Sequence, residues 1–396
     1  MTLPGSLHRW PVSGAMMALL AACGAPAIVA RPVGTLPASS ASAAARAAPA
    51  VPARLGDSAF WKLESDVSEP GGYFRIEDNY TSNETEVGRL FTMLRETGVQ
   101  GGVYLGVGPE QNFTYIAAIR PQMAFVVDIR RQAVMQHLMF KAMFELAADR
   151  ADFISILFGK PRPRGIDSTT PIQRIWDAFM RVPTDSALSS RNYVRIVDRL
   201  TKTHGFTFTP DESEKLKAVF NAFYYYGPGI TTRGAPSRRG GDFVSLTAYS
   251  NDSAGQARSF LTSEENYRIV KSLQDRNLIV PVSGDFGGPK TVRAIGAYLK
   301  EHDGTVTAFY VSNVEQYLFG DGKAGAFYAN VAALPVDSTS VFIRPFSMRR
   351  WFGGVGSRVQ SLCPIAPFVR AALAGRVPDN NTALACALII GRTIPP

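Results

Sequence analysis

The sequence contains little cysteine or histidine and none of the common catalytic signatures. It has three cysteines and four histidines in 396 residues, and no two cysteines form a CxxC pair. A zinc site made of cysteine and histidine is therefore not expected. The phosphate loop G-x-x-x-x-G-K-[ST], the nucleophile elbow G-x-S-x-G and the metalloprotease motif H-E-x-x-H are also missing. The chain thus lacks the sequence marks of P-loop enzymes, α/β-hydrolases and zinc peptidases, and we expect no bound metal.

Long runs of lysine or arginine are absent too, although the net charge is +9 from 42 basic and 33 acidic residues. The basic side chains gather only in short loops without interleaved aromatic residues, so the charge predicts a scattered basic surface and no nucleic-acid partner. Hydrophobic residues make up 46% of the chain and charged residues 19%, which is an ordinary globular composition. The length allows one large domain or two of medium size.

The N-terminus is typical of an export signal. His8-Arg9 precedes an apolar stretch, Val12 to Ala22, that is too short to span a membrane with confidence, and small residues follow. The sequence LAACG at residues 20–24 is similar to the bacterial lipobox, in which the cysteine, here Cys23, is lipidated after cleavage. Residues 24–54 are rich in Ala, Pro and Ser and predict a disordered tether. An Ala-rich upstream extension that is disordered, or not coding at all, is the alternative.

The export signal decides where the protein is expected to be. If it is used, residues 1–54 are a signal and tether, and the protein is periplasmic or anchored to a membrane through Cys23. If it is not used, the protein is cytoplasmic. The same choice governs Cys363 and Cys386, which can pair in an oxidising periplasm but are two unrelated apolar residues in a cytoplasm.

Beyond residue 55, apolar strand patterns alternate with helical patterns. Strands are expected at 103–105, 123–127, 242–249, 278–282, 305–311 and 340–344, and helices at 85–97, 131–158, 171–182, 187–204, 211–226, 264–276 and 291–302. This alternation predicts an α/β, Rossmann-like domain over residues 55–350, with a mostly parallel sheet and helices on both faces. Residues 131–240 are too long for one crossover and are interpreted as a helical insertion that caps the sheet. Residues 351–396 are expected to form a C-terminal extension.

The most informative segment is residues 102–130, GVYLGVGPEQNFTYIAAIRPQMAFVVDIR. An apolar run meets the turn Gly106-Val107-Gly108, a helix-length segment follows, and a second apolar run ends at Asp128. Such a unit is typical of sites for nucleotide-like ligands. The glycines let the backbone come close to the ligand, the helix N-terminus offers free N–H groups, and the acid accepts hydrogen bonds from the ribose hydroxyls. Two later loops, 283–290 and 312–316, also follow predicted strands, and a parallel sheet brings such loops to one edge.

Each residue of this unit has a functional and a structural interpretation. Gly106 and Gly108 are candidates for lining a ligand, or for an ordinary strand–helix turn. Glu110 and Gln111 are candidate hydrogen-bonding groups for the ligand, or residues of the first helical turn, where an acid complements the helix dipole. Asp128 is a candidate ribose-binding acid, or the cap of the next helix.

The later loops supply the candidate catalytic residues. Asp285 lies in a glycine-rich turn and is a candidate general base or substrate ligand, or simply a turn aspartate. Asn313 and Glu315 follow a strand, where either can contact a ligand, and Asn313 also suits a helix N-cap. His137 falls on an apolar helical pattern and is interpreted as a buried structural histidine.

These residues carry a family resemblance. GVGPE at residues 106–110, followed by VVD at 126–128, resembles the first two motifs of class I S-adenosylmethionine-dependent methyltransferases. The segments GVGPEQNFTYIA, VVDIRR, GDFGGPK, FYVSNVEQYLF and LPVDSTSVFIRPF resemble more closely, over about residues 70–346, a group of uncharacterised bacterial proteins with that Rossmann-like fold.

The methyltransferase resemblance implies roles for four residues. Gly106 and Gly108 would line the methionine part of S-adenosylmethionine, Asp128 would bind its ribose, and Asp285 would face the substrate. Glu110 departs from the pattern, because it stands where a G-x-G-x-G loop has its third glycine. The export signal departs from it as well, because S-adenosylmethionine is kept in the cytoplasm.

Two functions therefore remain open. The first is a methyltransferase-like protein that binds a nucleoside-type ligand and acts on an unknown small molecule or protein, with Asp285 or Asn313 orienting the nucleophile. The second is an exported, lipid-anchored binding protein that is not an enzyme and retains the Rossmann-like fold.

Overall fold

The computed structural model describes residues 50–386 except 76–77, 85–86, 236–240 and 348–357. The expectations about the export signal, Cys23 and most of the tether concern residues outside this range. None of the helices described here is long and apolar enough to cross a membrane.

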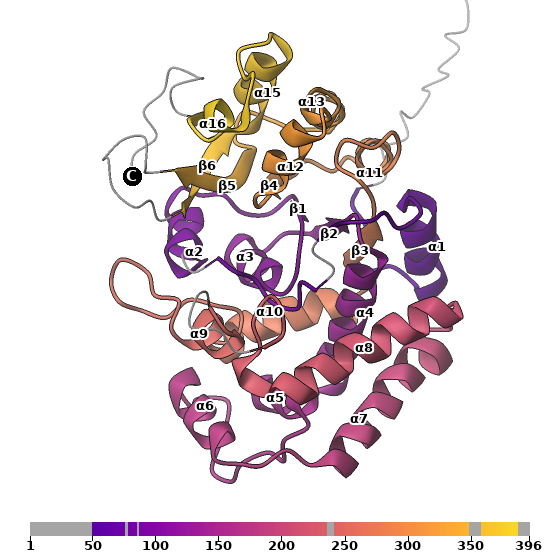
Figure 1. The fold of residues 1–396 in the computed structure, drawn as a ribbon, viewed down its shortest axis with the longest axis vertical. Helices are drawn as coiled ribbons and strands as arrows, with labels where there is room; N and C mark the ends of the chain where they lie inside the picture. Colours follow the sequence, from indigo (N-terminus) through magenta and orange to yellow (C-terminus); the bar gives the residue numbers. More distant parts are fainter. Residues whose placement is uncertain (1–49, 76–77, 85–86, 236–240, 348–357, 387–396) are drawn as a thin grey trace, which may run out of the picture. The chain divides into compact units, whose positions relative to one another are not determined.

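Six strands form one sheet, in the order β3-β2-β1-β4-β5-β6 (Figure 1). The strands are β1 Val103–Gly106, β2 Met123–Asp128, β3 Ile279–Ser283, β4 Val306–Tyr310, β5 Val341–Ser347 and β6 Arg358–Pro364. The first five run parallel, and β6 pairs antiparallel with β5. The predicted α/β class with a mostly parallel sheet is thus confirmed. The strand order is compatible with a Rossmann-like fold, because it reverses beside β1 as doubly wound sheets do.

Two groups of helices cover the sheet. The first comprises α2 Val87–Glu96, α3 Gln111–Ile119, α4 Arg131–Leu146 and α10 Glu264–Asp275, in which α3 packs against α2 and α10, and α10 packs against α4. The second comprises α1 Asp57–Val67, α11 Thr291–Glu301, α13 Ala324–Ala332 and α15 Ile365–Leu373, in which α11 packs against α1 and α13, and α13 packs against α15. The chain runs from β1 through β2 to β3 in one direction and then from β3 past β1 through β4 to β5 in the other. Right-handed crossovers therefore place α3, α4 and α10 on one face of the sheet, and α11 and α13 on the other. The short helix α12, Val314–Gly320, follows β4 and packs against α13 and α16, Asn380–Ala383.

The connection between β2 and β3 holds a helical layer, drawn in magenta and red in Figure 1. After α4 it contains α5 Arg150–Phe158, α6 Ile172–Met180, α7 Ser186–Asp198, the π-helical turn η1 Arg199–Thr203, α8 Pro210–Tyr226, the 3₁₀ turn η2 Gly227–Gly229 and α9 Phe243–Ala248. Helix α4 packs on β2 and β3 and against α8, so it joins this layer to the sheet. Helix α8 begins with the capping box of Thr209 and Glu212.

Two predicted elements in this region are wrong. The single helix expected over 131–158 is two helices, because the backbone of Ala147 is extended and the Asp149 side chain caps α5 by accepting from the Asp152 N–H. The strand expected over 242–249 is α9. Its alternating pattern is overridden by a capping box, in which Asp242 and Ser245 each accept a hydrogen bond from the other's backbone N–H.

The residues expected to form a C-terminal extension supply β6, α15 and α16. Strand β6 completes the edge of the sheet, and a disulfide joins Cys363 on this strand to Cys386 after α16, with their Cα atoms 6.0 Å apart. The C-terminal residues that the structure describes are therefore part of the same core as the sheet.

Candidate functional site

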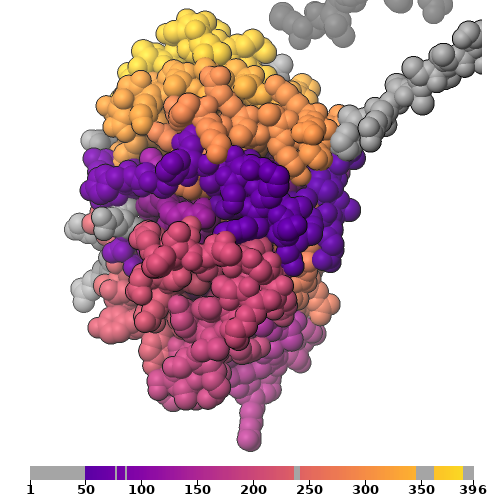
Figure 2. Space-filling model, turned by 90° about the vertical axis from the view of Figure 1, so that its right-hand side faces the viewer, coloured from indigo at the N-terminus to yellow at the C-terminus, as the bar shows by residue number. Residues whose placement is uncertain are grey.

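A cavity of about 240 Å³ lies at the carboxyl ends of the first four strands. Its wall includes four of the residues predicted from the sequence, namely Gly108, Asp128, Asp285 and Asn313. The segment between α1 and α2 adds Tyr73, Phe74, Asn79, Ser82 and Asn83. Figure 2 shows the chain before β1, in indigo, as a band between the helical layer in magenta and red and the later helices in orange. The cavity thus lies where the strand order reverses, which is where open α/β sheets bind ligands.

The two glycines after β1 have different roles. A Cβ atom on Gly106 would collide with Asn112 Oδ1 and the Tyr104 hydroxyl, so this glycine serves internal packing and does not line the cavity. Gly108 lines the cavity and has φ of +79°, in the left-handed region that favours glycine. Only the second of the two predicted glycines is therefore placed to approach a ligand.

Asn112 fixes the shape of this loop. Its Nδ2 group donates to the carbonyl oxygens of Val107, Gly108 and Pro109, at 3.0, 3.1 and 2.7 Å. Its Oδ1 accepts from the Tyr104 hydroxyl at 2.8 Å, and the side chain is fully buried. Sequence reasoning gave Asn112 no role. The one sequence feature that could have indicated it is that an asparagine lies in a largely apolar helix.

His137 holds the same loop from α4. Its Nε2 lies 2.8 Å from the carbonyl oxygen of Gly108, and the ring is buried as expected. Burial lowers the pKa of His137, which favours a neutral ring that donates from Nε2. The histidine is therefore structural, and what it fixes is the glycine that lines the cavity.

Glu110 lies at the N-cap position of α3 and is only 2% exposed. Its Oε1 accepts from the Ser82 N–H at 3.2 Å, and its Oε2 has no partner among the residues that the structure describes. Burial raises the pKa of Glu110 to about 7. The side chain is not part of the cavity wall, although the flanking Pro109 and Gln111 are.

Asp128 lies at the end of β2, where a ribose-binding acid is expected, but it already has a partner. Arg130 donates to Asp128 Oδ1 from its backbone N–H at 3.0 Å and from Nε at 2.9 Å, and its Nη2 lies 2.8 Å from Oδ2. A carboxylate has about four acceptor positions. The three donors from Arg130 therefore leave about one position, on Oδ2.

The later loops place Asp285 and Asn313 at the cavity and Glu315 away from it. Asp285 accepts from the Gly287 N–H at 2.9 Å and pairs with Lys323 Nζ at 2.6 Å, so its carboxylate is engaged. Asn313 occupies the N-cap position of α12 without making a side-chain cap hydrogen bond. Glu315 is buried behind the cavity wall.

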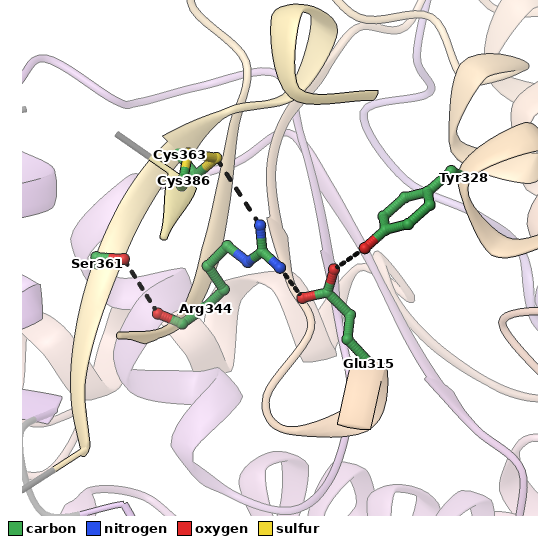
Figure 3. Close-up of a disulfide and its surroundings, with 6 residues drawn as sticks. All are labelled: Glu315, Tyr328, Arg344, Ser361, Cys363 and Cys386. Carbon is green, nitrogen blue, oxygen red and sulfur yellow. Dashed lines mark hydrogen bonds and ion pairs between the residues drawn. A yellow bond between two sulfur atoms is a disulfide. The ribbon is translucent and has the colours of Figure 1, made fainter. Parts of the chain in front are cut away.

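Figure 3 shows the surroundings of Glu315. Its carboxylate pairs with Arg344 of β5 and accepts from the Tyr328 hydroxyl at 2.7 Å. Arg344 also reaches to 4.0 Å from Cys363 Sγ and lies over the Phe368 ring, 4.2 Å from its centroid. Glu315 therefore connects α12 to β5 and does not contact a ligand in the cavity.

Three further polar residues complete the wall between β1 and β4. Gln111 donates from Nε2 to the Tyr310 hydroxyl at 3.0 Å, and its buried Oε1 has no partner within the described part of the chain. Ser312 has φ of +46° and donates to Glu84 Oε1 at 2.9 Å. Strained backbone is often found at functional sites. Sequence reasoning assigned no role to Tyr310 or Ser312, because their pairing depends on elements far apart in the chain.

Most of the cavity residues lie in the part of the chain that matches a protein-family model. A family model described as a domain of unknown function, DUF7790, matches residues 80–163 and 244–375, which is more than half of the chain. The chain belongs to this family. The DUF7790 match includes Gly108, Asp128, Asp285 and Asn313, and it omits the stretch that contains α6, α7 and α8. No curated protein matches the chain.

Proposed function

We propose that the protein binds a nucleoside-type ligand in this cavity and is a methyltransferase-like protein that uses S-adenosylmethionine. The observation that carries the proposal is the position of Gly108 and Asp128 in the wall of one cavity, at the point where the strand order reverses. Dinucleotide-binding and related α/β folds use the same two positions for close backbone approach and for ribose. We also propose that the fold is Rossmann-like, because the strand order reverses beside β1.

The donors and acceptors of the cavity fit the nucleoside part of such a ligand. The remaining acceptor position on Asp128 Oδ2 suits a ribose hydroxyl, and the unpartnered Oε1 of Gln111 suits an N–H or ammonium group. Phe74 and Tyr317, whose ring centroids lie 4.8 Å apart, supply aromatic surface at the wall. These few polar groups within a partly apolar wall are typical of small-molecule sites.

In this proposal the protein acts mainly by positioning. When bound, S-adenosylmethionine would supply an electrophilic methyl group. A nucleophile on a small molecule or protein would take this methyl group, S-adenosylhomocysteine would leave with the electron pair of the broken C–S bond, and the proton of the nucleophile would pass to solvent. Asn313 lines the cavity and makes no side-chain cap hydrogen bond, which supports a role for its amide in orienting the nucleophile. Asp285 is held by Lys323, and its role is to keep the β3 loop in place beside the substrate.

Calorimetric titration with S-adenosylmethionine and with adenosine tests the proposal. We expect Asp128→Ala to weaken both affinities at least about tenfold, because it removes the ribose acceptor and leaves Arg130 without its carboxylate. Asp66→Ala, on the exposed face of α1, is the matched control and should leave both affinities unchanged. Absence of binding by the unmodified protein at millimolar ligand would refute the proposal.

The disulfide favours a second candidate function. Disulfides persist in oxidising compartments, and Cys363–Cys386 joins two elements of the fold. We therefore also propose an exported, non-enzymatic binding protein that uses the same cavity, with Cys23 as its lipid anchor. Cell fractionation with thiol alkylation distinguishes the two. A periplasmic or membrane-bound product with an oxidised pair supports export, and a cytoplasmic product with reduced thiols contradicts it.

A further inference from the structure

His204 lies where the helical layer meets two of the helices that cover the sheet. It follows the π-helical turn η1, and its backbone N–H donates to the Arg199 carbonyl at 3.1 Å, which closes that turn. The ring places Nδ1 2.8 Å from Asp57 Oδ1 of α1, and Nε2 2.6 Å from Glu145 Oε2 of α4. Helices α1 and α4 both pack on β3. One largely buried histidine therefore connects the helical layer to both helices.

Both contacts form only when the His204 ring is protonated. A neutral imidazole has one N–H donor and one acceptor nitrogen, whereas the imidazolium ion has two donors. An ionised carboxylate only accepts hydrogen bonds, so a ring that lies between Asp57 and Glu145 needs both protons. Burial lowers the pKa of His204, but the hydrogen bonds to Glu145 and Asp57 and the charge of Glu145 outweigh burial and raise the pKa above 6.5. The ring therefore loses its second proton as the pH rises through that raised value.

The two carboxylates are not held equally well. Glu145 also pairs with Lys141 at 2.6 Å and lies 3.8 Å from Arg199 Nε, and its side chain is 8% exposed. Asp57 is 41% exposed, and its one other side-chain hydrogen bond to the described residues comes from Asn277 Nδ2, at 2.8 Å. When the ring loses a proton, we expect the remaining one to stay on Nε2, opposite Glu145. The contact between Nδ1 and Asp57 is then the one that is lost.

The other charged side chains near this cluster are paired among themselves. Lys271 and Asp275 of α10 lie 3.2 Å apart. Asp198, at the end of α7, and Lys202 of η1 lie 2.9 Å apart. Carboxylates and amines ordinarily titrate far from neutral pH, whereas histidine titrates close to it. Among these groups, His204 is therefore the one whose charge changes near neutral pH.

Apolar packing holds the ring when its charge is lost. His204 stacks on Phe206 with the ring centroids 5.1 Å apart, and Phe206 stacks on Trp61 of α1 at 4.8 Å. A neutral imidazole retains this stacking, because the contact is made by the ring faces. Loss of the proton should therefore loosen the start of α1 without detaching the helical layer.

We propose that His204 is a pH-sensitive switch: the protonated ring holds η1 to both α1 and α4, and the neutral ring releases the start of α1. The physical basis is that a charge-assisted hydrogen bond is replaced by a lone pair that faces a carboxylate. This inference goes beyond the proposed function and does not depend on it. Helix α1 leads into the segment that contains the cavity-wall residues Tyr73 and Phe74, so the switch acts on an element that is joined to the cavity.

NMR of the full chain labelled at histidine tests the protonation step. The chain has four histidines, and His204→Gln identifies the signal of His204. We expect this signal to titrate with a midpoint above pH 6.5. Asp57→Asn removes one of the two carboxylate charges and should lower the midpoint. Asp66→Asn is the matched control, because Asp66 is an exposed acid of the same helix that pairs with Lys62, and it should leave the midpoint unchanged.

Hydrogen exchange tests the release of α1. Protection factors, which correct for the intrinsic pH dependence of exchange, should fall about tenfold for the Phe60 and Trp61 amides as the pH rises through the midpoint. Amides of α13 should keep their protection, and in His204→Gln the α1 amides should show no such step. If His204→Gln does not fold, Asp57→Asn identifies the His204 signal by its shifted midpoint. A midpoint at or below pH 6.5, or unchanged α1 protection across the titration, overturns the inference.

Discussion

Glu110 is a carboxyl group whose protonation depends on the fold. It ionises freely in an unfolded chain, whereas in the folded protein burial raises its pKa from 4.5 to about 7. The folded state therefore holds the proton more tightly than the unfolded state does. Its contribution to stability is fully present below pH 4.5 and is lost as the pH rises through about 7.

This difference predicts a pH-dependent change in the free energy of unfolding. Between pH 4.5 and pH 7 the unmodified protein should lose up to about 3 kcal/mol relative to Glu110→Gln, since one pKa unit corresponds to about 1.4 kcal/mol. Urea unfolding of both proteins across this range measures the difference, and the subtraction removes groups common to both, such as His204. Parallel pH profiles for the two proteins would show that Glu110 does not titrate in this way.

Asp128 shows how far a single position can be interpreted from sequence. The segment VVDIRR, residues 126–131, indicates that a strand ends at Asp128 before a helix, and it contains Arg130. That Arg130 folds back and holds both carboxylate oxygens depends on the backbone conformation after β2. The sequence thus identified the acid, and the structure showed that most of its acceptor positions are already used.

At the scale of elements, the connection between β1 and α3 is defined by a helix side chain. Asn112 binds the three consecutive carbonyl oxygens of the loop, and His137 of α4 binds the middle one. These contacts place Gly108 at the cavity wall. The loop geometry is therefore determined by packing between α3, α4 and the sheet as well as by the glycines.

Asn112→Ala should accordingly destabilise the protein by about 2–4 kcal/mol, because it leaves several buried polar groups without a partner. It should also weaken nucleoside binding by displacing Gly108. Asn192→Ala is the control. Asn192 is equally buried, but its side chain makes only one long hydrogen bond to the residues that the structure describes, 3.4 Å to the Ile156 carbonyl. Equal losses of stability in urea unfolding would contradict the role given to Asn112.

The element predictions failed where a local side-chain interaction competes with periodicity. Alternation over 242–249 favours a strand, but Asp242 and Ser245 stabilise the first turn of α9. Continuous apolar residues over 131–158 favour one helix, but Asp149 caps a new one. Strand β6 was missed because its place depends on pairing with β5, and a short strand at the edge of a sheet has a weak sequence pattern.

At the scale of the whole molecule, the C-terminal region is tied to the rest in two ways. The disulfide joins β6 to the chain after α16, and α16 packs against α12, which contributes to the cavity wall. The buried pair of Glu315 and Arg344 joins α12 to β5 (Figure 3). The cavity wall and the C-terminal elements therefore depend on one another.

Replacing both Cys363 and Cys386 with serine should lower the free energy of unfolding by about 3 kcal/mol, because the cross-link restricts the unfolded chain. Urea unfolding of the oxidised protein, the reduced protein and the double variant measures this effect. The reduced protein and the variant should agree within experimental error. An unchanged midpoint on reduction would show that the pair adds nothing to stability.

The sequence by itself determined the α/β class, the parallel strands and the edge of the sheet where the polar loops gather. It could do so because apolar periodicity and glycine turns are local properties of the chain. Only the tertiary structure decided which of those residues face the cavity. Gly106 packs against Asn112 and Tyr104. Asp285 forms an ion pair with Lys323, 38 residues later in the chain, and Glu315 of α12 forms one with Arg344 of β5. Pairing between distant charges follows from three-dimensional packing, which no local pattern records.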